Sequence, residues 1–405
     1  MLKLSKRIIS APESPIRKLA KFADQAKRRG IKVYHLNIGQ PDIETPREMT
    51  GALKNFSEKI IYYTDSQGIA ELLEAFLVHY RKLGVKGLKK ENLIVTAGGS
   101  EGLLWAMEAV ADAGEEIIVL EPFYANYEGF ASLAGVKLVP VTTKIENGFH
   151  LPAEKEILEK ISKKTKAILI ANPNNPTGTI YTKNEIELLA KICKKQKLFL
   201  IVEPVYQDFY FEGKQPFFAL NLEKKYLEQV VVVDSLSKRY SLCGARIGCL
   251  ASFNKQVIEN VLKYAQARLC AGMVDQIMAE KMIKIKASYS EKIRAEYKKR
   301  RDVLCEGLSK ISGVKFLVPE GAFYLVCELP VDDAELFCQW LLTDFSLDGE
   351  TVMQAPASGF YKTAGLGKKQ VRIAYVLKAS DLKKAMKILK IAIEKYISKA
   401  SPRCA

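Results

Sequence analysis

One segment of the sequence places a lysine and an arginine among hydroxyl groups and glycines. Residues 235–248 read SLSKRYSLCGARIG, with Lys238 eight residues before Arg246. A lysine attacks an aldehyde only when neutral, and a nearby cation together with partial burial lowers the pKa of its amine toward that state. Arg246 offers that cation and could also bind a phosphate, with Ser235 and Ser237 as further donors. These residues predict a nucleophilic lysine beside an anion site, and a surface lysine in a polar loop is the alternative.

A second candidate for phosphate binding is VTAGGSEG at residues 95–102, where an apolar strand pattern runs into two glycines. Glycines at the start of a helix allow backbone N–H groups to approach an anion closely. Gly99, Ser100 and Glu101 are therefore candidate phosphate ligands. The segment lacks the G-x-x-x-x-G-K-[ST] spacing of a nucleotide P-loop, so it does not indicate ATP. A strand-to-helix turn without a ligand is the alternative interpretation.

Two further polar segments follow apolar runs. NPNNPTG, at residues 172–178, predicts a turn that holds the amide of Asn175 between an asparagine and a proline. EPVYQDF, at residues 203–209, places the Glu203 carboxylate three residues before the Tyr206 phenol. Ligands of open α/β sheets bind at the carboxyl ends of the strands, which makes these side chains candidates for a binding site. Taken singly, each could equally be a turn residue, a solvated carboxylate or a packed ring.

The elements that must position these residues alternate between short apolar runs and longer amphipathic stretches. Several of the runs are apolar on both faces, as buried parallel strands are. The alternation predicts an α/β fold with a mainly parallel central sheet between helices. The predicted strands are Leu93–Thr96, Ile117–Leu120, Val136–Val141, Ala167–Ala171, Leu198–Val202 and Val230–Val233, and the predicted helices include Gly102–Ala111, Asn184–Lys195 and Gln256–Tyr264.

The pattern changes after about residue 290. The elements predicted there are a charged helix over Glu291–Ile311, strands at Val314–Val318 and Ala322–Glu328, and a last helix near Ser380–Ile397. We expect residues 291–405, together with residues 1–45, to form a smaller α+β domain. Residues 46–290 would then form the large domain that carries the candidate site.

The composition of the 405 residues is that of a globular chain, with 48% hydrophobic and 27% charged residues. The sequence shows neither a transmembrane stretch nor a secretory signal, so we expect a cytoplasmic protein without membrane association. Eight scattered cysteines predict thiols rather than a disulfide framework, and with three histidines we expect no metal site. The net charge of +16 comes largely from lysines interspersed with acidic residues, which favours a solvated surface over a nucleic-acid partner.

Seven blocks carry a resemblance that no single motif could. In chain order they are NIGQPDIETP, YTDSQGIAELLEAF, VTAGGSEG, EPFYANY, NPNNPTG, SLSKRYSLCGARIG and VRIAY. Their order and spacing resemble those of class I aminotransferases of pyridoxal 5′-phosphate fold type I, and most of all bacterial aspartate aminotransferases of the I-gamma kind. The resemblance covers residues 1 to about 397. It implies a ping-pong transfer of an amino group from an amino acid, with aspartate expected, to a 2-oxo acid, with 2-oxoglutarate expected.

The resemblance also assigns roles. Lys238 would carry pyridoxal phosphate as a Schiff base and then act as the base at the substrate Cα. Tyr124 would stack on the cofactor ring, and Asn175 and Tyr206 would donate hydrogen bonds to its phenolic oxygen. The implied phosphate ligands are Gly99, Ser100, Glu101, Ser235, Ser237, Arg246 and, from the neighbouring subunit of a homodimer, Tyr63. The implied ligands of the substrate carboxylate are Arg372, Asn175 and the backbone of Gly39.

One position departs from the family pattern. Where the family usually has Asp-Glu before the Val-Tyr pair, this sequence has Glu203 and Pro204. The expected aspartate keeps the pyridine nitrogen protonated, and glutamate retains the carboxylate on a longer side chain. We therefore expect transamination to be retained, and we carry as alternatives a lyase of the same fold and a weakly active relative. The sequence shows no cation for a distal substrate carboxylate, since Ser100 and Glu101 stand where some relatives have a basic residue.

Overall fold

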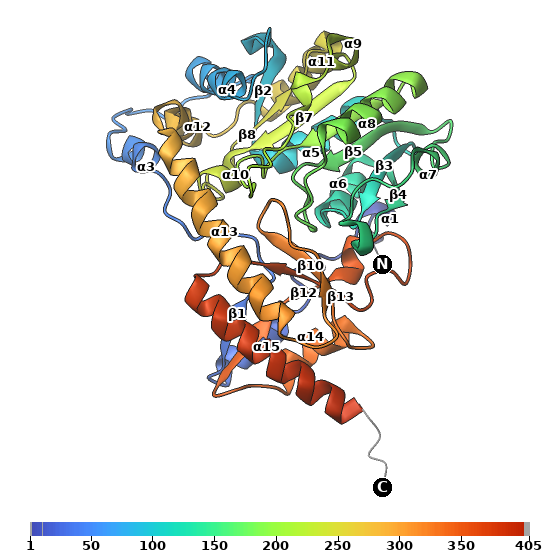
Figure 1. Ribbon diagram of the computed structural model, residues 1–405. Helices are drawn as coiled ribbons and strands as arrows, with labels where there is room; N and C mark the ends of the chain where they lie inside the picture. The colour runs from blue at the N-terminus through green and yellow to red at the C-terminus, as the bar shows by residue number, and fades with distance from the viewer. Residues whose placement is uncertain (1, 10, 401–405) are drawn as a thin grey trace.

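The computed structural model describes residues 2–9 and 11–400 of the chain, and its largest sheet has seven strands in the order β2-β8-β7-β6-β5-β3-β4 (Figure 1). From β7 to β4 all neighbouring strands are parallel, whereas β8 runs antiparallel to both β2 and β7. The predicted mainly parallel sheet is confirmed. The strands are β2 Leu93–Thr96, β3 Glu116–Glu121, β4 Lys137–Thr142, β5 Thr165–Ala171, β6 Phe199–Glu203, β7 Val230–Ser235 and β8 Gly248–Ala251.

Both faces of this sheet are buried, because successive side chains of a strand point to opposite faces. Ile118 of β3 packs in a cluster with side chains of α4 and α8, while its neighbours Ile117 and Val119 pack in a second cluster with α5, α6 and α11. The helices of this part are α3 Arg47–Lys54, α4 Ala70–Lys82, α5 Gly98–Val110, α6 Asn126–Ala134, α7 Glu154–Leu158, α8 Lys183–Gln196, α9 Lys224–Leu227, α10 Leu236–Arg239, α11 Lys255–Arg268 and α12 Met273–Ala279, with short 3-10 turns at Lys90–Asn92, Ile145–Asn147, Ala219–Asn221 and Glu280–Lys284.

A second group of elements builds a separate apolar core from the C-terminal residues and the N-terminal segment. It contains a four-stranded antiparallel sheet, β12-β13-β10-β9, and a two-stranded parallel sheet in which β1 pairs with β11. Two long helices, α13 and α15, pack side by side along it (Figure 1). The elements are α2 Ala20–Arg28, β1 Lys32–His35, α13 Ala287–Ser309, β9 Lys315–Phe316, β10 Tyr324–Glu328, α14 Ala334–Thr343, β11 Glu350–Met353, β12 Ala355–Pro356, a 3-10 turn at Ala357–Phe360, β13 Gln370–Ala374 and α15 Ala379–Ala400. The short helix α1, Lys6–Ile9, is drawn near β4 rather than with this group (Figure 1).

The structure differs from the sequence-based expectation in a few elements. Strand β8, Gly248–Ala251, has the sequence GCLA, which lacks the β-branched character of its neighbours and was not predicted. Strand β9 is confined to two residues, Lys315–Phe316, where a strand of five was expected. The division into residues 46–290 and the remainder stays a prediction, and α13 begins at Ala287, close to that boundary.

The remaining expectations concern thiols, metals and membranes. The seven cysteines in the described ranges are free, and Cys404 lies outside those ranges. No group of three or more His, Cys, Asp or Glu side chains that could hold a metal ion occurs among the described residues. Within the same residues, no helix is both long and apolar enough to cross a membrane.

The topology brings the polar segments to one edge of the large sheet. Strands β3, β5, β6 and β7 are parallel, so the residues that follow them meet at the edge where the carboxyl ends lie. Strand β2 shares this direction because β8 is antiparallel to both β2 and β7. The N-terminus of α5, which follows β2, therefore lies at the same edge as the segments after the other strands.

Candidate active site

Lys238 lies in a cavity of about 360 Å³ between the large sheet edge and the second group of elements. Its Nζ atom donates a hydrogen bond of 2.8 Å to the carbonyl oxygen of Gly39 and lies 3.8 Å from Sγ of Cys243. Tyr206 and Arg372 line the same cavity. Lys238 and Arg372 are more than 130 positions apart in the sequence, and the fold places both at the same cavity.

The helical turn that carries Lys238 is held by hydrogen bonds on one side and by buried ion pairs on the other. The Ser235 hydroxyl caps α10 by accepting a hydrogen bond of 3.2 Å from the Ser237 backbone N–H. On the far side, the buried guanidinium of Arg239 pairs with Asp208 and, at 3.2 Å, with Asp234. Because Arg239 and Asp234 are buried and Asp208 is only partly exposed, this network fixes α10 and the direction in which Lys238 leaves it.

The predicted phosphate ligands gather at the N-terminus of α5. The Ser235 hydroxyl donates to the Ser237 hydroxyl at 2.9 Å. Gly98 begins α5 at φ +78°, and a Cβ atom there would lie 2.5 Å from a terminal nitrogen of Arg246. The guanidinium therefore approaches the first turn of the helix only because that residue is glycine. Gly98, which the sequence did not single out, is the glycine that this approach requires.

The side chain of Glu101 is engaged in contacts within the protein. Its carboxylate accepts a hydrogen bond of 2.7 Å from the backbone N–H of Ala97 and forms an ion pair of 2.7 Å with Arg268. The side chain closes the start of α5 and is already paired, and a carboxylate would repel a phosphate. Its backbone N–H is the group that remains a candidate ligand, as are Gly99 and Ser100.

Glu203, at the end of β6, is 7% exposed and has a hydrogen-bond partner that the sequence reading missed. The Tyr127 hydroxyl donates to its Oε2 at 2.5 Å. Burial raises the pKa of Glu203 to about 7, although the Tyr127 hydrogen bond and the charge of Lys238 act in the opposite direction. Tyr127 stands edge-on to Tyr124 at 5.5 Å between ring centroids. Its position three residues after Tyr124 in EPFYANY was an available signal.

Arg372, on β13, is 1% exposed and has the character of an anion-binding group. Its guanidinium donates to Oδ1 of Asn175 at 3.2 Å and to the carbonyl oxygen of Asn37 at 2.5 Å. Its Nε has no hydrogen-bond partner among the described residues. Its charge is balanced there by neutral oxygens and by the face of Tyr324, 4.4 Å from the guanidinium carbon. A buried cation without a carboxylate partner is suited to receive one from a ligand.

Tyr324 is a second residue that the sequence reading missed. Its hydroxyl lies 3.0 Å from that of Tyr206, and a Cβ atom added to Gly39 would lie 1.7 Å from the Tyr324 oxygen. Gly39 is therefore required for the close approach of the two segments. Tyr324 stands opposite Ala374 on β13, two residues from Arg372, a pairing that only the tertiary structure shows.

Tyr63, which was predicted to act from a neighbouring subunit, does not line this cavity. Its side chain is 76% exposed, and Ile60, Ile61 and Tyr62 beside it are also exposed. Tyr124, by contrast, lines the cavity, and its hydroxyl accepts a hydrogen bond of 2.8 Å from Asn126.

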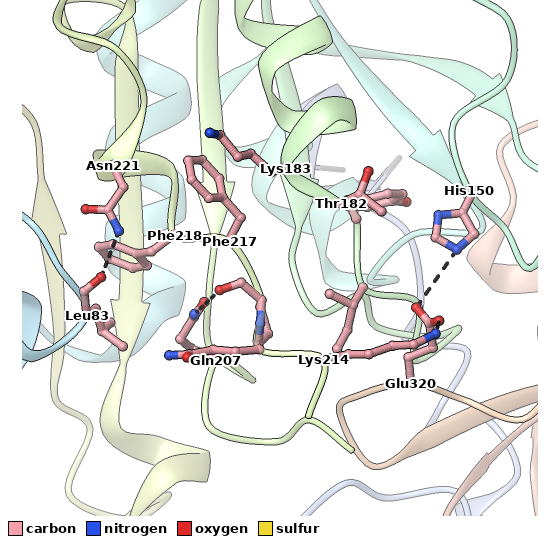
Figure 2. Close-up of a pocket in the computed structure, with 14 residues that line it drawn as sticks. Leu83, His150, Thr182, Lys183, Gln207, Lys214, Phe217, Phe218, Asn221 and Glu320 are labelled. Atoms are coloured by element: carbon pink, nitrogen blue, oxygen red, sulfur yellow. Dashed lines mark hydrogen bonds and ion pairs between the residues drawn. The ribbon is translucent and has the colours of Figure 1, made fainter. Parts of the chain in front are cut away.

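A larger cavity, of about 570 Å³, lies elsewhere and does not contain these residues (Figure 2). His150, Lys214 and Glu320 line one side of it, and Gln207 borders it directly after Tyr206 in the chain. It has neither a buried arginine nor a lysine at a strand end, so its size alone does not make it the active site.

The smaller cavity has the donor set that pyridoxal 5′-phosphate needs. The Lys238 amine and the Tyr124 ring line the cavity, and the N-terminus of α5 with two hydroxyls and Arg246, together with the buried Glu203 carboxyl, lies at the same edge of the sheet. Gly39 allows the Tyr324 hydroxyl, and Gly98 the Arg246 guanidinium, to lie closer to the backbone than any residue with a Cβ atom would permit. Together with the mainly parallel sheet, these features define the class: a pyridoxal-phosphate enzyme of fold type I.

Comparisons with known proteins place the chain within that class. It belongs to the family described as aminotransferase class I and II, whose model matches residues 31–389. It is 29% identical to an aspartate aminotransferase from Pyrococcus horikoshii over 96% of this chain and 97% of that protein. It is also 29% identical to aromatic-amino-acid aminotransferase 2 from Thermococcus litoralis over 95% of this chain and 96% of that protein. The crystal structure of an aspartate aminotransferase from Thermotoga maritima matches with a TM-score of 0.87 and 30% identity, covering 98% of this chain and 100% of the other. The protein is a pyridoxal-phosphate-dependent aminotransferase.

Proposed function

We propose that this aminotransferase exchanges the amino group of aspartate with 2-oxoglutarate. The observation that carries the proposal is the buried Arg372, whose Nε has no partner among the described residues, in the same cavity as Lys238. An α-carboxylate bound by that guanidinium would hold an amino acid beside the amine. The relatives named aspartate aminotransferases support the choice of donor.

The roles of the surrounding residues follow from their placement. Pyridoxal phosphate, when bound, supplies an electron sink for the electrons of the substrate Cα–H bond. Lys238 would hold the cofactor aldehyde and, once freed by the substrate amine, would remove the proton from Cα. Arg372 and Asn175, already joined at 3.2 Å, would fix the α-carboxylate so that this bond has one orientation. Tyr206 and Asn175 would donate to the phenolic oxygen of the ring.

Glu203 would take the position of the usual aspartate beside the pyridine nitrogen. Its carboxyl is buried and already accepts one hydrogen bond from Tyr127, so a second, cationic partner would favour the ionised form. The phosphate would lie against the start of α5, with Ser235, Ser237 and Arg246 as donors.

A homodimer in the cytoplasm is part of the proposal. The exposed run from Ile60 to Tyr63 is apolar and carries the tyrosine that would reach the phosphate of the neighbouring subunit. The seven free thiols are consistent with a reducing compartment. Sedimentation velocity of wild type and of Tyr63→Phe would separate assembly from the phosphate contact, because the variant should keep the dimer and lose cofactor affinity.

A panel of amino donors with 2-oxoglutarate tests the substrate. Aspartate should give the highest kcat/KM, with alanine, phenylalanine and leucine as comparisons. Reaction of only aromatic or branched donors would refute the aspartate assignment. Borohydride reduction of the holoenzyme followed by peptide mapping should find the cofactor on Lys238, and a label on another lysine would overturn the site.

A further inference from the structure

The hydroxyl of Tyr324 lies where three segments of the active site meet. Tyr324 is a buried residue of β10, and it lines the cavity that contains Lys238. Its hydroxyl oxygen lies 3.0 Å from that of Tyr206, and its ring lies against the guanidinium of Arg372 at 4.4 Å. The backbone of Gly39, whose carbonyl oxygen accepts the hydrogen bond from Lys238, passes close to the same hydroxyl. One side chain of the second group of elements therefore contacts residues assigned to the cofactor and to the substrate carboxylate.

The hydrogen bond between the two phenols has a direction that a bound cofactor would fix. A phenol carries one proton, so it donates one hydrogen bond while its oxygen can accept another. Burial raises the pKa of Tyr206 well above its ordinary value, with the neighbouring Tyr324 as a further cause, so this phenol keeps its proton. When Tyr206 donates that proton to the phenolic oxygen of the cofactor, its own oxygen is left to accept a bond from the Tyr324 hydroxyl.

The Tyr324 hydroxyl is free to make this bond and is held in place for it. Within residues 2–9 and 11–400, Tyr206 is its hydrogen-bond partner and no other group bonds to it. The two rings stand at 80° to each other with their centroids 5.5 Å apart. Strand β10 is paired with β13, where Tyr324 stands opposite Ala374. A buried ring on a paired strand has little freedom to move, so the hydroxyl is presented to Tyr206 by a fixed element.

We propose that Tyr324 is a positioning residue that donates to Tyr206 and thereby strengthens the hydrogen bond from Tyr206 to the cofactor, an inference that rests on the role of Tyr206 in the proposed function. Hydrogen bonds in a chain polarise one another, so a phenol that accepts one bond donates the next more strongly. Tyr206 would therefore stabilise negative charge on the phenolic oxygen of the cofactor better than an isolated phenol does. That charge is larger when the Schiff-base nitrogen on Lys238 has lost its proton, so the two tyrosines together lower the pKa of that nitrogen.

The ring of Tyr324 has a second contact that the test must preserve. The Arg372 guanidinium lies over this ring and also donates to Oδ1 of Asn175 at 3.2 Å. Tyr324→Phe removes the hydroxyl and keeps the ring, so the site for the α-carboxylate should be retained. The variant therefore isolates the bond to Tyr206 from the contact with Arg372.

The test is an absorbance titration of the Schiff-base nitrogen in the holoenzyme, which does not depend on activity. Tyr206→Phe should raise the pKa of that nitrogen by about one unit, the value of a lost charge-assisted hydrogen bond. Tyr324→Phe should raise it by roughly 0.3 unit, because the second bond of a chain strengthens the first by only a fraction. The double variant should titrate like Tyr206→Phe alone, because Tyr324 acts only through Tyr206.

Tyr297→Phe is the matched control. Tyr297 is buried in the same aromatic cluster and stacks on Phe323, the neighbour of Tyr324, at 5.3 Å between ring centroids. Its hydroxyl has no hydrogen-bond partner in the part of the chain that the structure describes. The control therefore loses a buried hydroxyl from the same cluster without touching Tyr206, and it should titrate like wild type. A shift as large as that of Tyr324→Phe would show an effect of packing and would overturn the proposal.

The remaining outcomes separate this inference from the proposed function. An unchanged titration in Tyr324→Phe, or an additional shift in the double variant, would overturn the role of Tyr324. KM of Tyr324→Phe for the amino donor should stay within about twofold of wild type, and a larger rise would show that the hydroxyl acts through Arg372 instead. An unshifted Tyr206→Phe would refute the contact between Tyr206 and the cofactor, and the inference with it. A donor panel in which aspartate is not preferred would refute the proposed substrate and leave the expected titrations as they are.

Discussion

We predict that the buried carboxyl of Glu203 makes the free energy of unfolding depend on pH and also affects the activity. Burial raises its pKa to about 7 from an ordinary value of 4.5, so in the folded apoprotein it remains protonated up to near neutral pH. In the unfolded chain the same group ionises near pH 4.5. Between these two values the unfolded state binds fewer protons than the folded state, and the free energy of unfolding falls as the pH rises. The difference of 2.5 pKa units, at 1.36 kcal/mol each, amounts to about 3 kcal/mol lost by pH 8.

The variant Glu203→Gln removes the titrating group and keeps the shape of the side chain. Its unfolding free energy should lack this decline, so the difference between variant and wild-type apoprotein should shift by about 2.5 kcal/mol in favour of the variant from pH 5 to pH 8. Urea denaturation at the two pH values measures the shift, and other titrating groups cancel in the comparison. Glu203→Asp retains a carboxyl and should retain the decline.

The same substitution should impair catalysis. A neutral amide cannot keep the pyridine nitrogen protonated, so kcat of Glu203→Gln should fall by about a hundredfold or more. Identical pH dependence of stability in wild type and Glu203→Gln would refute the raised pKa. Unchanged kcat would refute the placement of Glu203 beside the ring. The two outcomes are independent, because the first concerns the empty site and the second the loaded enzyme.

Three further substitutions test the remaining groups of the site. Lys238→Ala should abolish transamination and the borohydride-stable label, while circular dichroism shows an unchanged fold; residual label would place the amine elsewhere. Arg372→Lys should raise KM for every amino donor at least about tenfold, because an ammonium cannot form the planar two-point contact, and a change confined to one donor would contradict a shared α-carboxylate site. Gly39→Ala should lose most activity because its Cβ would lie 1.7 Å from the Tyr324 oxygen, and activity close to wild type would show that this close approach is not needed.

The sequence predicted best what depends on local pattern. Apolar runs such as Ala167–Ala171 and Val230–Val233 became β5 and β7, and the residues after them lie where the carboxyl ends of parallel strands meet. Strand β8 was missed because GCLA has little strand propensity and is held between β2 and β7 by pairing on both sides. Its antiparallel direction is a tertiary property that no local pattern encodes.

Within the site, residues adjacent to recognisable blocks were found and those brought in by folding were not. Tyr324 reaches the cavity through the pairing of β10 with β13 and has no signal in its own segment, whereas Asn37, which contacts Arg372, begins the block NIGQPDIETP but was not singled out. Gly98 was passed over for Gly99 because the sequence cannot show which of two glycines faces the guanidinium of Arg246.

The departure at residues 203 and 204 is accommodated by two features of the fold. Glu203 is the last residue of β6, so Pro204 falls beyond the ladder and its missing N–H removes no strand hydrogen bond. The carbonyl oxygen of Glu203 still accepts from the Asn172 backbone at 3.0 Å, which keeps the end of β6 aligned with the segment that carries Asn175. The glutamate side chain is one methylene longer than aspartate and therefore has more rotational freedom. The hydrogen bond from the Tyr127 hydroxyl holds its carboxyl in one position. Tyr127 therefore positions the Glu203 carboxyl, which under the proposed function would act in place of the shorter carboxylate expected in the family.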